Sequence, residues 1–492
     1  MNNSAGDRHY QPISKANALA ERPRSRKLCT SLMEAVRRSG LKDGMTISFH
    51  HSFRGGDMTV NLVLGLLAYM GFKNLTLASS SLTDCHSPLI EHIRNGLVSR
   101  IYTSGLRGPL AEAISSGLLA EPVQIHSHGG RVQLIQSGEL SIDVAFLGVP
   151  TCDEFGNANG FTGKARCGSL GYAFTDADYA KTVIILSEEI APYPLQPASI
   201  KQDQVDWVVQ VEQVGDAGKI GAGATRMTSN PRELLIARRA ADVIEHSGYF
   251  RDGFSLQTGT GGASLAVTRF LEDKMVRKNI RAGFALGGIT STMVQLHEKG
   301  LIDCLLDVQG FDGEAAQSLG RNPRHFEISA NQYANPDSKG NAVDRLDVVV
   351  LSALEIDTAF NVNVLTGSDG VLRGASGGHC DTAASAKMAV IVAPLVRGRI
   401  PTVVSKVLTI VTPGSSIDVL VTDHGIAVNP ARPELLARFA KAGLPLMTIN
   451  ELYQRALELT GEPEPIAFTQ RTVAVVRYRD GSVIDTIRQV QE

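Results

Sequence analysis

The sequence has almost no excess of charge of either sign. Its 48 Lys and Arg residues nearly balance 50 Asp and Glu residues, and the formal net charge is −2. Proteins that bind nucleic acid usually carry a basic excess or a basic stripe; this sequence has neither, so we expect no nucleic-acid partner. The longest apolar run, residues 62–72, is far shorter than the about 20 residues that cross a membrane. We therefore expect no membrane partner.

Cysteine is scarce and follows no pattern. The six cysteines are Cys29, Cys85, Cys152, Cys167, Cys304 and Cys380. They form no C-x-x-C pair and no zinc-binding spacing, so the sequence predicts no metal site. The first thirty residues are polar and basic without an apolar centre, so they predict no secretory signal. Together these features favour reduced, buried thiols in a cytoplasmic protein.

Glycine is the residue that the sequence has in excess. The 48 glycines among 492 residues make up about 10%, against about 7% in typical proteins. They are clustered and not periodic, which indicates Gly-rich loops and not a collagen-like or linker sequence. The 43% hydrophobic and 20% charged residues are ordinary for a globular chain, and the length accommodates two large α/β domains.

The two halves of the sequence match one another at a nearly constant spacing. Residues 142–159 (IDVAFLGVPTCDEFGNAN) mirror 346–363 (LDVVVLSALEIDTAFNVN), and 168–181 (GSLGYAFTDADYAK) align without a gap on 374–387 (GASGGHCDTAASAK). In each half an Asp-Gly pair also opens a strand-like run that ends in a Gly-rich turn. Matching residues stay 204 to 206 positions apart. One offset held over three separate segments predicts an internal duplication.

Each half predicts alternating strands and helices. β-Branched runs typical of strands buried on both faces, and apolar residues at helical spacing, alternate along the chain, as at 183–186, 231–245, 348–351, 390–392 and 433–442. We therefore expect an α/β fold with two tandem homologous domains and mostly parallel sheets. In such sheets ligands bind at the carboxyl ends of the strands.

The predicted domain plan has four parts. Residues 1–40 form a polar arm and an amphipathic helix around 28–36, and residues 41–211 form the first domain. Residues 212–230 form a Gly-rich linker, and 231–492 form the second domain. An Asp-Gly turn splits the last strand-like run, which predicts a C-terminal hairpin that we assign to the second domain.

Glycine turns end two predicted strands of the second half. Gly259, Gly261 and Gly262 precede a predicted helix, where a ligand can approach the backbone and the free N–H groups favour negative charge. Gly287 and Gly288 follow the strand predicted over 282–286. Neither the dinucleotide fingerprint nor the P-loop is present. Two interpretations remain open, a tight packing turn and a site for an anion or a thioester carbonyl.

A third cluster, GGHCD at 377–381, is polar where the matching residues of the first half carry apolar bulk. This asymmetry is expected if the second half holds the reaction centre. His379 is a candidate carboxylate binder or proton donor, or else a residue that caps the following helix. A nucleophilic Cys380 is less favoured, because consecutive side chains point in different directions.

The motif D-x-x-x-N-x-N occurs in both halves, which favours Asx turns at strand ends. The alternative is ligand contact by Asn361 or Asn363. Basic side chains of the first half lie near predicted loops, as ordinary exposed charges or as a polycarboxylate site in which charge-assisted hydrogen bonds hold the ligand. They are His50, His51, Arg54, Lys164 and Arg166.

Five segments resemble the coenzyme A transferase family, and most closely its citrate lyase α-subunit branch: DGMTISFHHSFRGGD (43–57), GDAGKIGAGATRMTSNP (215–231), VQGFDGEAAQSL (308–319), LEIDTAFNVNVLTGSDG (354–370) and GGHCDTAASAKMAVIVAPLVRGRIPTVV (377–404). The resemblance implies transfer of a carrier thiol from an acetyl thioester to citrate, which gives citryl thioester and acetate. It implies no tightly bound cofactor; coenzyme A, or an acyl carrier protein with a coenzyme-A-derived arm, is the co-substrate.

The resemblance also implies partners. These are the citrate lyase β subunit, which cleaves the citryl group, and the acyl carrier (γ) subunit, in a larger complex in which this chain is a homo-oligomer. On this basis we expect citrate at the five basic residues named above. The thioester is expected at Gly259, Gly261, Gly262, Gly377, Gly378, Asn361 and Asn363.

One departure from the family concerns the mechanism. Many coenzyme A transferases attack the thioester with a glutamate in a short S-E-N-G-like motif, where this sequence has GGIT at 287–290 and no carboxylate. The resemblance therefore implies direct attack by citrate through a mixed anhydride, with Gly287, Gly288 and His379 at the reaction centre. Glu314 is the best remaining candidate for a covalent carboxylate.

Two other functions stay open. An acetyl-CoA hydrolase or a short-chain acid CoA-transferase would need a nucleophilic glutamate such as Glu314 or Glu327. A metabolite-sensing module can use the same fold class, but no DNA-reading element accompanies the duplicated domain.

Overall fold

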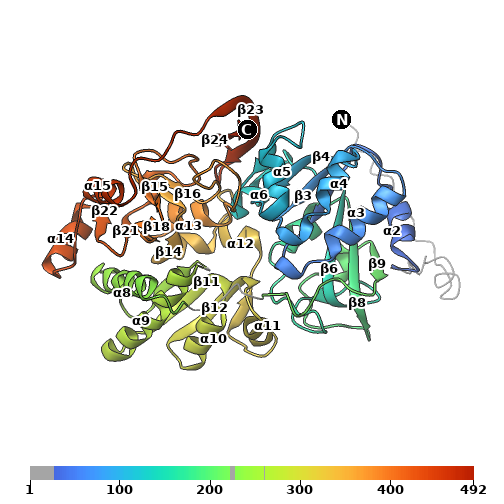
Figure 1. Cartoon of the computed structure of the whole chain (residues 1–492). Coiled ribbons are helices and arrows are strands. Elements are labelled where there is room, and N and C mark those ends of the chain that lie inside the picture. The colour runs from blue at the N-terminus through green and yellow to red at the C-terminus, as the bar shows by residue number, and fades with distance from the viewer. Residues whose placement is uncertain (1–26, 222–227, 260, 492) are drawn as a thin grey trace, which may run out of the picture.

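The computed structural model describes residues 27–221, 228–259 and 261–491, in which two α/β halves lie side by side (Figure 1). Each half is built on a mostly parallel sheet with helices packed against it, so the predicted fold class is confirmed. The predicted N-terminal arm up to residue 26 and residues 222–227 of the predicted linker lie outside the described residues. Within these residues, no helix is long and apolar enough to cross a membrane.

The first sheet has eleven strands. In spatial order they are β1 (Leu28–Cys29), β9 (Trp207–Gln210), β8 (Thr182–Ala191), β6 (Val144–Asp153), β2 (Thr46–Phe49), β3 (Leu75–Ser79), β4 (Val98–Thr103), β5 (Val123–Ile125), β23 (Phe468–Arg477) and β24 (Val483–Val490), with β7 (Ala158–Asn159) paired to β6. Neighbouring strands run parallel except in the pairs β6–β7 and β23–β24.

The second sheet has eight strands, all parallel to their neighbours except β21 and β22. In spatial order they are β13 (His325–Glu327), β12 (Ile302–Gly310), β11 (Ala282–Ile289), β10 (Phe254–Thr258), β14 (Val348–Ser352), β17 (Met388–Val392), β21 (Val419–Val421) and β22 (Ile426–Val428). Two small sheets accompany it, β16 (Val362–Asn363), β15 (Glu355–Asp357) and β20 (Val403–Val404), and β18 (Val396–Arg397) with β19 (Ile400–Pro401).

The order of the central strands is the same in both halves. The series β8-β6-β2-β3-β4-β5 in the first sheet recurs as β17-β14-β10-β11-β12-β13 in the second. An aspartate–lysine contact repeats in both halves as well. Asp143 accepts a hydrogen bond from Lys181 Nζ (2.7 Å), and Asp347 accepts one from Lys387 Nζ (2.6 Å). These matching contacts agree with the internal duplication.

Helices cover the sheets of both halves. In the first half they are α2 (Leu32–Ser39), α3 (Thr59–Tyr69), α4 (Leu89–Arg94), α5 (Gly108–Ser115), α6 (His128–Gln136) and α7 (Ala173–Tyr179), with short 3-10 turns η1 (Arg54–Gly56), η2 (Asp84–His86) and η3 (Gln202–Gln204). In the second half they are α8 (Pro231–His246), α9 (Gly262–Lys278), α10 (Ser291–Glu298), α11 (Gly313–Leu319), α12 (Ala330–Ala334), α13 (His379–Ser385), α14 (Pro433–Lys441) and α15 (Ile449–Thr460), with η4 (Ala342–Arg345) and η5 (Gly414–Ser416).

Local signals explain where these helices begin and end. α8 starts at Pro231 after the Asn230 cap, as the sequence predicts. The first helix starts later than the predicted 28–36, because Leu28 and Cys29 pair with β9 and Ser31 caps α2 by accepting from Glu34 N–H.

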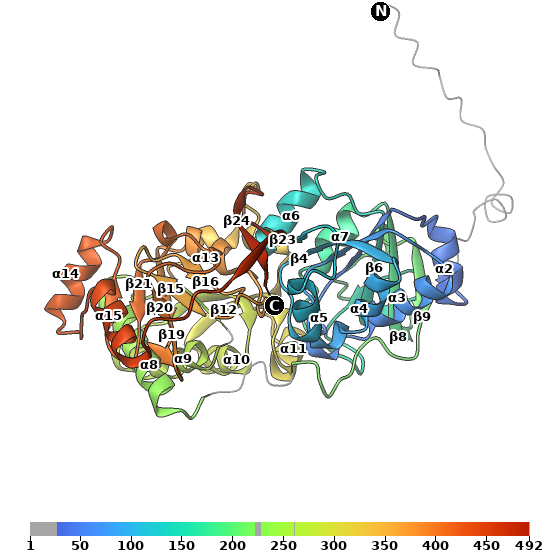
Figure 2. The ribbon, with the colours of Figure 1, turned by 45° about the horizontal axis from the view of Figure 1, so that its top comes forward.

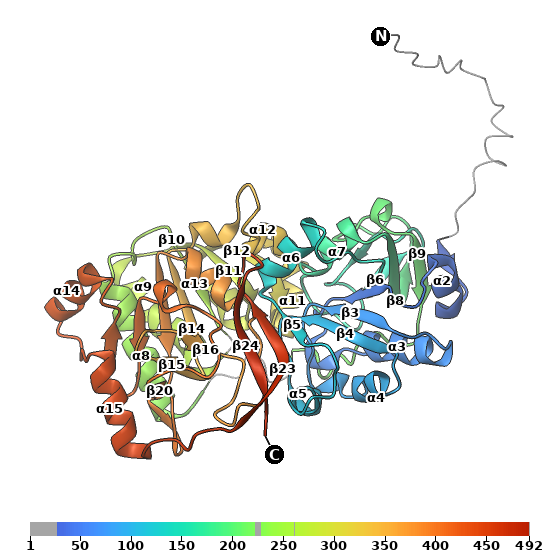
Figure 3. The same cartoon turned by 90° about the horizontal axis from the view of Figure 1, so that it is seen from above.

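The C-terminal hairpin forms, but it joins the first sheet and not the second domain, to which we had assigned it. β23 pairs in parallel with β5 at the edge of the first sheet, and β24 follows antiparallel to β23. Figures 2 and 3 show these red strands beside the teal elements of the first half. Val476 is fully buried in the core of the first half, so apolar burial and an otherwise unpaired strand edge decide the placement.

The hairpin assignment predicts where a core lesion will act. Val476→Asp places a charge in the first core and should destabilise the protein by about 3 kcal/mol or more. Val483→Asp, at a side chain that is 58% exposed on β24, is the matched control. In hydrogen exchange, Val476→Asp should weaken protection of β5 amides and leave β10 amides protected; loss of protection at β10 instead would contradict the assignment.

Candidate active site

The carboxyl ends of strands from both sheets meet along the seam between the halves. From the first half come His51 after β2, Ser80 after β3, Ser104 after β4 and His126 to His128 after β5; from the second come Gln257 of β10, Gly287 and Gly288 of β11 and Gln309 of β12. Hydrogen bonds join the two halves directly, from Ser376 N in the second half to Ser104 O (2.7 Å) and from Gln309 Nε2 to His51 O (3.0 Å).

Two matching loops, one in each half, each accept a hydrogen bond from a helix of the other half. Gly171 O, in the first half, accepts from Ala330 N at the start of α12 (2.8 Å). Gly377 O, its counterpart in the second half, accepts from His128 N at the start of α6 (2.8 Å). The two loops therefore tie each half to the first turn of a helix in the other half.

Three rings from the first half stack at the seam. Tyr172 lies 4.6 Å from His51 and 4.4 Å from His128, measured between ring centroids. Burial holds the pKa of His51 well below its ordinary value, and the nearby His128 and Arg54 lower it further. Burial likewise lowers the pKa of His128 to about 3. Both imidazoles are therefore neutral at pH 7.

Glycines of the second half give room to two polar side chains next to this stack. Gln257 Nε2 donates to Tyr333 Oη (2.9 Å). A side chain at Gly378 would come within 2.5 Å of the Tyr333 hydroxyl, and one at Gly287, whose φ is +96°, would come within 2.7 Å of the Gln257 amide. The two glycines therefore permit the close approach of Tyr333 and Gln257.

A third glycine holds an aromatic ring against a guanidinium. A side chain at Gly288 would come within 1.8 Å of the Phe311 ring, and Arg54 Cζ lies 4.3 Å from the centroid of that ring. We use the name seam ring for the residues that these contacts connect: His51, Arg54, His128, Tyr172, Gln257, Gly287, Gly288, Phe311, Tyr333, Gly377 and Gly378.

Several buried polar atoms at the seam have no hydrogen-bond partner among the described residues. They are Ser104 Oγ, His126 Nε2, His128 Nδ1, Gln257 Oε1, Thr258 Oγ1 and Ser376 Oγ. Native proteins rarely leave such atoms unsatisfied, and each costs roughly 1–3 kcal/mol. The hydroxyls of Ser104, Thr258 and Ser376 can donate to the oxygen atoms of a ligand, whereas Gln257 Oε1 can only accept from a ligand hydroxyl.

Two arginines add positive charge at the same edge. Burial lowers the pKa of Arg54 to about 10, and the charge of Arg107 lowers it further. Arg107 directly precedes α5, next to Leu106, whose N–H donates to Gly374 O across the seam (3.1 Å). Neither guanidinium takes part in an ion pair within the described ranges. A carboxylate ligand would relieve the repulsion between them.

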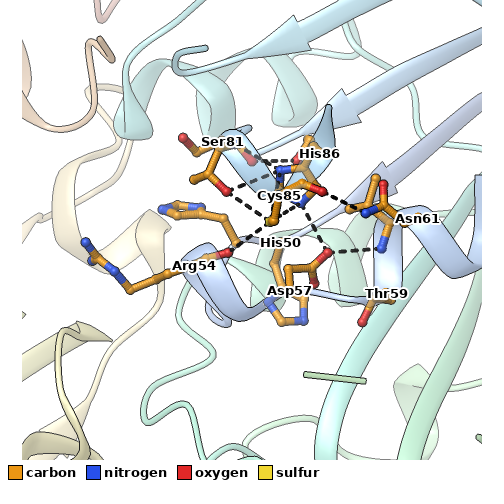
Figure 4. Close-up of polar contacts among 12 residues, drawn as sticks. His50, Arg54, Asp57, Thr59, Asn61, Ser81, Cys85 and His86 are labelled. Atoms are coloured by element: carbon orange, nitrogen blue, oxygen red, sulfur yellow. Dashed lines mark hydrogen bonds and ion pairs between the residues drawn. The ribbon is translucent and has the colours of Figure 1, made fainter. Parts of the chain in front are cut away.

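The backbone of Arg54 is strained and is held by a polar network (Figure 4). Its φ is +55°, a conformation that costs a non-glycine residue roughly 1–3 kcal/mol. Arg54 O accepts from Asp57 N (3.2 Å) and from Cys85 Sγ (3.7 Å). His86 Nδ1 accepts from Thr83 N, so His86 Nε2 carries the hydrogen that it donates to Asp57 (3.2 Å). Figure 4 shows the Arg54 side chain extending from this network toward the second half.

Comparison with known proteins decides the family. The family model described as citrate lyase, alpha subunit, matches residues 25–490. The citrate lyase alpha chain of Escherichia coli K12 is 75% identical over 483 residues, 98% of this chain and 95% of that protein. The chain belongs to the citrate lyase α-subunit family. The alpha chain of Haemophilus influenzae Rd is 70% identical, over 98% of this chain and 97% of that protein.

Solved structures agree. A citrate lyase α subunit from Streptococcus mutans, in complex with citrate, has 54% identity and a TM-score of 0.94, over 99% of this chain and 94% of that one. The 4-hydroxybutyrate CoA-transferase of Porphyromonas gingivalis, at 19% identity and a TM-score of 0.55 over 87% of this chain and 97% of that one, shares the fold alone.

The structure brings only some of the five predicted citrate residues to the seam. His51 and Arg54 belong to the seam ring. His50 is buried, donates from Nε2 to Gly148 O (2.7 Å) and accepts from Ser52 N, so both of its nitrogens are engaged. Lys164 and Arg166 are exposed on the loop between β7 and α7.

The predicted thioester glycines fall in two places. Gly377 and Gly378 belong to the seam ring. Gly259, Gly261 and Gly262 form the turn between β10 and α9, but a side chain at Gly262 would come within 2.8 Å of the Glu233 carboxylate. This negative charge at the start of α9 disfavours a second anion there.

The two asparagines serve the turns that the motif predicts. Asn361 accompanies Asp357, whose Oδ1 accepts from Asn361 N (2.9 Å), as Asp153 Oδ1 accepts from Asn157 N in the first half (3.0 Å). Asn363 is fully buried, and its Oδ1 accepts from two backbone N–H groups. The geometry therefore favours the Asx-turn interpretation over ligand contact.

The two glycines placed after β11 in fact lie within it, since β11 extends to Ile289. The sheet register shifts between Gly287 and Gly288, an irregularity often found beside active sites. Their missing side chains seat Gln257 and Phe311, so packing explains both glycines directly.

The two candidate glutamates have hydrogen-bond partners outside the seam ring. Glu314 is exposed on α11, and its carboxylate accepts from Gln295 of α10 (3.4 Å). Glu327 is buried, which raises its pKa to about 7, and its oxygens accept from Leu170 N (2.6 Å) and Ser199 Oγ (2.5 Å). Glu327 therefore joins the two halves. Within the described part of the chain no group of His, Cys, Asp and Glu is arranged to hold a metal ion, and all six cysteines are unpaired.

Sequence reasoning missed much of the seam. It did not select Ser104, Arg107, His128, Tyr172, Gln257, Phe311 or Tyr333. A signal existed for some of them: His126-Ser127-His128 follows a short apolar run directly, where a ligand-binding strand end is expected. The apolar ring of Tyr172 gave no such signal. The histidines and the arginine of the seam ring come from the first half, whereas we had expected the reaction centre in the second half.

The surroundings of His379 indicate a structural role for its side chain. Its Nε2 donates to Ser352 O (3.0 Å), its Nδ1 accepts from the Thr412 hydroxyl (2.7 Å), and burial lowers its pKa to about 4. An unfolded histidine titrates near 6.5, so the stability from this neutral group is present above about pH 6.5 and is lost as pH falls toward 4.

We expect His379→Gln to remove this pH-dependent decrease in the free energy of unfolding, which is about 3 kcal/mol between pH 7 and pH 4. Urea unfolding of both proteins at several pH values measures the difference. Equal pH dependence in the two proteins would contradict the prediction. Complete loss of transfer activity in folded His379→Gln would favour a catalytic histidine.

Proposed function

We propose that this chain transfers the thiol of an acyl carrier, or of coenzyme A, from an acetyl thioester to citrate at the seam ring. The observation that carries the proposal is the set of buried polar atoms at strand ends of both halves that have no partner among the described residues, together with two guanidiniums that make no ion pair there. Membership of the citrate lyase α-subunit family supports it. The citrate complex of the Streptococcus mutans relative supports citrate as the acceptor.

Citrate recognition falls to the positive edge of the seam. Arg54 and Arg107 bind carboxylates through charge-assisted hydrogen bonds. The hydroxyls of Ser104 and Ser376 lie on segments that are hydrogen-bonded to one another across the seam, and neither hydroxyl has a protein partner among the described residues. A carboxylate can therefore be shared between the two halves.

The chemistry needs no covalent enzyme intermediate. A citrate carboxylate oxygen attacks the acetyl thioester carbonyl, the C–S bond breaks, and the carrier leaves as a thiolate. The thiolate then attacks the citryl carbonyl of the mixed anhydride, and acetate leaves. Holding the reactants together supplies about 7–11 kcal/mol, and each oxyanion donor about 3–4 kcal/mol. The neutral His128 and the serine hydroxyls are candidate donors, and Gly377 and Gly378 line the thioester side.

The chain then works as one subunit of a complex. The relatives are α chains of citrate lyase, and coenzyme A or an acyl carrier protein fits as the co-substrate. We propose the acyl carrier (γ) and β subunits as partners, the β subunit cleaving the citryl group, with several copies of this chain in the cytoplasm.

The runner-up reaction uses a glutamyl intermediate. Its candidates are Glu314, which is exposed, and Glu327, whose carboxylate is engaged by Leu170 and Ser199. Neither belongs to the seam ring, so direct transfer is the better-supported mechanism.

Mass spectrometry of the purified chain with an acetyl thioester and citrate tests the function. Citryl thioester and acetate, formed only with citrate present, are expected. Acetate released without citrate would identify a hydrolase. Citrate binding without turnover would identify a sensing module.

Arg54→Gln should raise the KM for citrate about 10- to 100-fold, because it removes hydrogen bonds to a charged ligand. Arg107→Gln should act in the same direction. The KM for the acetyl thioester should change less than twofold. Arg94→Gln, at an exposed arginine paired with Glu91, is the control; equal effects at positions 54 and 94 would refute the assignment.

Glu314→Gln should leave the rate of citryl thioester formation within about twofold of wild type, since its side chain lies on the outer helical layer. Steady-state kinetics measure the rate. A loss of more than 100-fold, together with a trapped glutamyl thioester in the wild-type chain, would replace direct transfer by the covalent mechanism.

A further inference from the structure

Phe311 faces Arg54 across the seam. It directly follows β12, and its backbone N–H donates to Ile289 O (2.9 Å). Its ring lies under the guanidinium, with 4.3 Å between Arg54 Cζ and the ring centroid. The ring occupies the space that a side chain at Gly288 would fill. The place of the ring is therefore set by the second sheet.

The same end of β12 makes a second contact with the same loop. Gln309 Nε2 donates to His51 O (3.0 Å). His51 O also accepts from Arg54 N (3.0 Å), which closes the turn that leads to Arg54. The turn is thus fixed to the second half at its backbone by Gln309 and at its side-chain end by Phe311.

An aromatic ring suits this task better than a carboxylate would. A carboxylate partner would fix the guanidinium but also neutralise it and compete with an anionic ligand. A ring face attracts the cation, fixes its plane and leaves its N–H donors free for a second partner. Arg54 accordingly keeps its charge and its donors, although its long side chain is half-buried and contacts the opposite half.

We propose that Phe311 is a positioning residue that aligns the Arg54 guanidinium for a carboxylate of the acceptor substrate. The proposal rests on the proposed function, in which Arg54 binds citrate. It adds that the second half sets the orientation of a citrate-binding group of the first half. Gly288 then serves this function indirectly, by making room for the ring.

A series of isosteric rings tests the proposal without removing packing. Phenylalanine at position 311 is replaced, in the full-length chain, by its 4-fluoro and 3,4,5-trifluoro analogues, which keep the shape but weaken the negative potential of the ring face. Citrate affinity, measured by calorimetry, should fall stepwise by about 3- to 30-fold in total. The KM for the acetyl thioester should change less than twofold.

Natural residues give a second test. Phe311→Leu should weaken citrate binding to a similar extent, and Phe311→Tyr should retain it within about twofold. In an Arg54→Gln background, Phe311→Leu should weaken binding by less than a further twofold, because the cation is already gone. Phe326→Leu, at an aromatic residue that is 46% exposed on β13, is the matched control. The melting temperature of each variant separates loss of packing from loss of alignment.

The outcomes separate the two proposals. Unchanged citrate affinity across the fluorinated series, or losses that add fully in the Arg54→Gln background, would overturn the role of Phe311 and leave the transferase intact. A wild-type chain that neither binds citrate nor forms citryl thioester would overturn the proposed function, and with it this role. A stepwise loss that disappears with Arg54 supports the role of Phe311 and the assignment of Arg54 to citrate.

Discussion

Parallel sheets place the residues that follow their strands along one edge, and in this protein two such edges face each other. Everything distinctive about the candidate site depends on that contact. His128 reaches Gly377, Ser376 reaches Ser104 and Gln309 reaches His51, each by a hydrogen bond from one half to the other. The site is consequently a property of the pair of halves, because the first half supplies Arg54 and Ser104 while the second supplies the Phe311 ring and Ser376.

The duplicated loops show how one structural plan acquired two uses. Gly171 and Gly377 make the same hydrogen bond to the first residue of a helix in the opposite half. The next residue differs: the Tyr172 ring packs against two histidines, whereas Gly378 leaves space that the Tyr333 hydroxyl occupies. The backbone hydrogen bond is therefore the same in both copies of the loop, but only the copy in the first half adds a side chain, Tyr172, to the site.

The sequence was sufficient for what depends on local pattern or on repetition. The start of α8 at Pro231 and the Asx turn at Asp357 follow from residues close to one another in the chain, and the duplication follows from segments that repeat at one offset. Contacts between distant segments were not accessible in that way. The hairpin around Val476 joins the first sheet because β23 pairs with the edge strand β5, about 350 residues earlier in the chain, and Val476 packs into the core of the first half. No local sequence pattern predicts this pairing.

The same distinction applies to the candidate site. Arg54 and His51 were found because charged residues beside a glycine turn are conspicuous, but Phe311 reads locally as an ordinary apolar residue before a helix. Gly288 looked like a donor of backbone hydrogen bonds and instead makes room for that ring. His379 looked like chemistry because it is titratable, yet burial and two engaged nitrogens keep it neutral. A residue type predicts a capability; only the partners decide whether it is used.

The electrostatics of the seam favour an anionic ligand without strong internal ion pairs. The imidazoles of His51 and His128 are neutral because burial outweighs their basicity, so the positive charge comes from Arg54 and Arg107. A carboxylate paired directly with Arg54 would remove the repulsion that a ligand otherwise relieves. Phe311 avoids this by attracting the guanidinium through its ring face, which keeps the N–H donors available to a ligand. The binding energy of a polycarboxylate can then hold residues of both halves against one substrate. A direct transfer between two bound acyl groups requires this positioning.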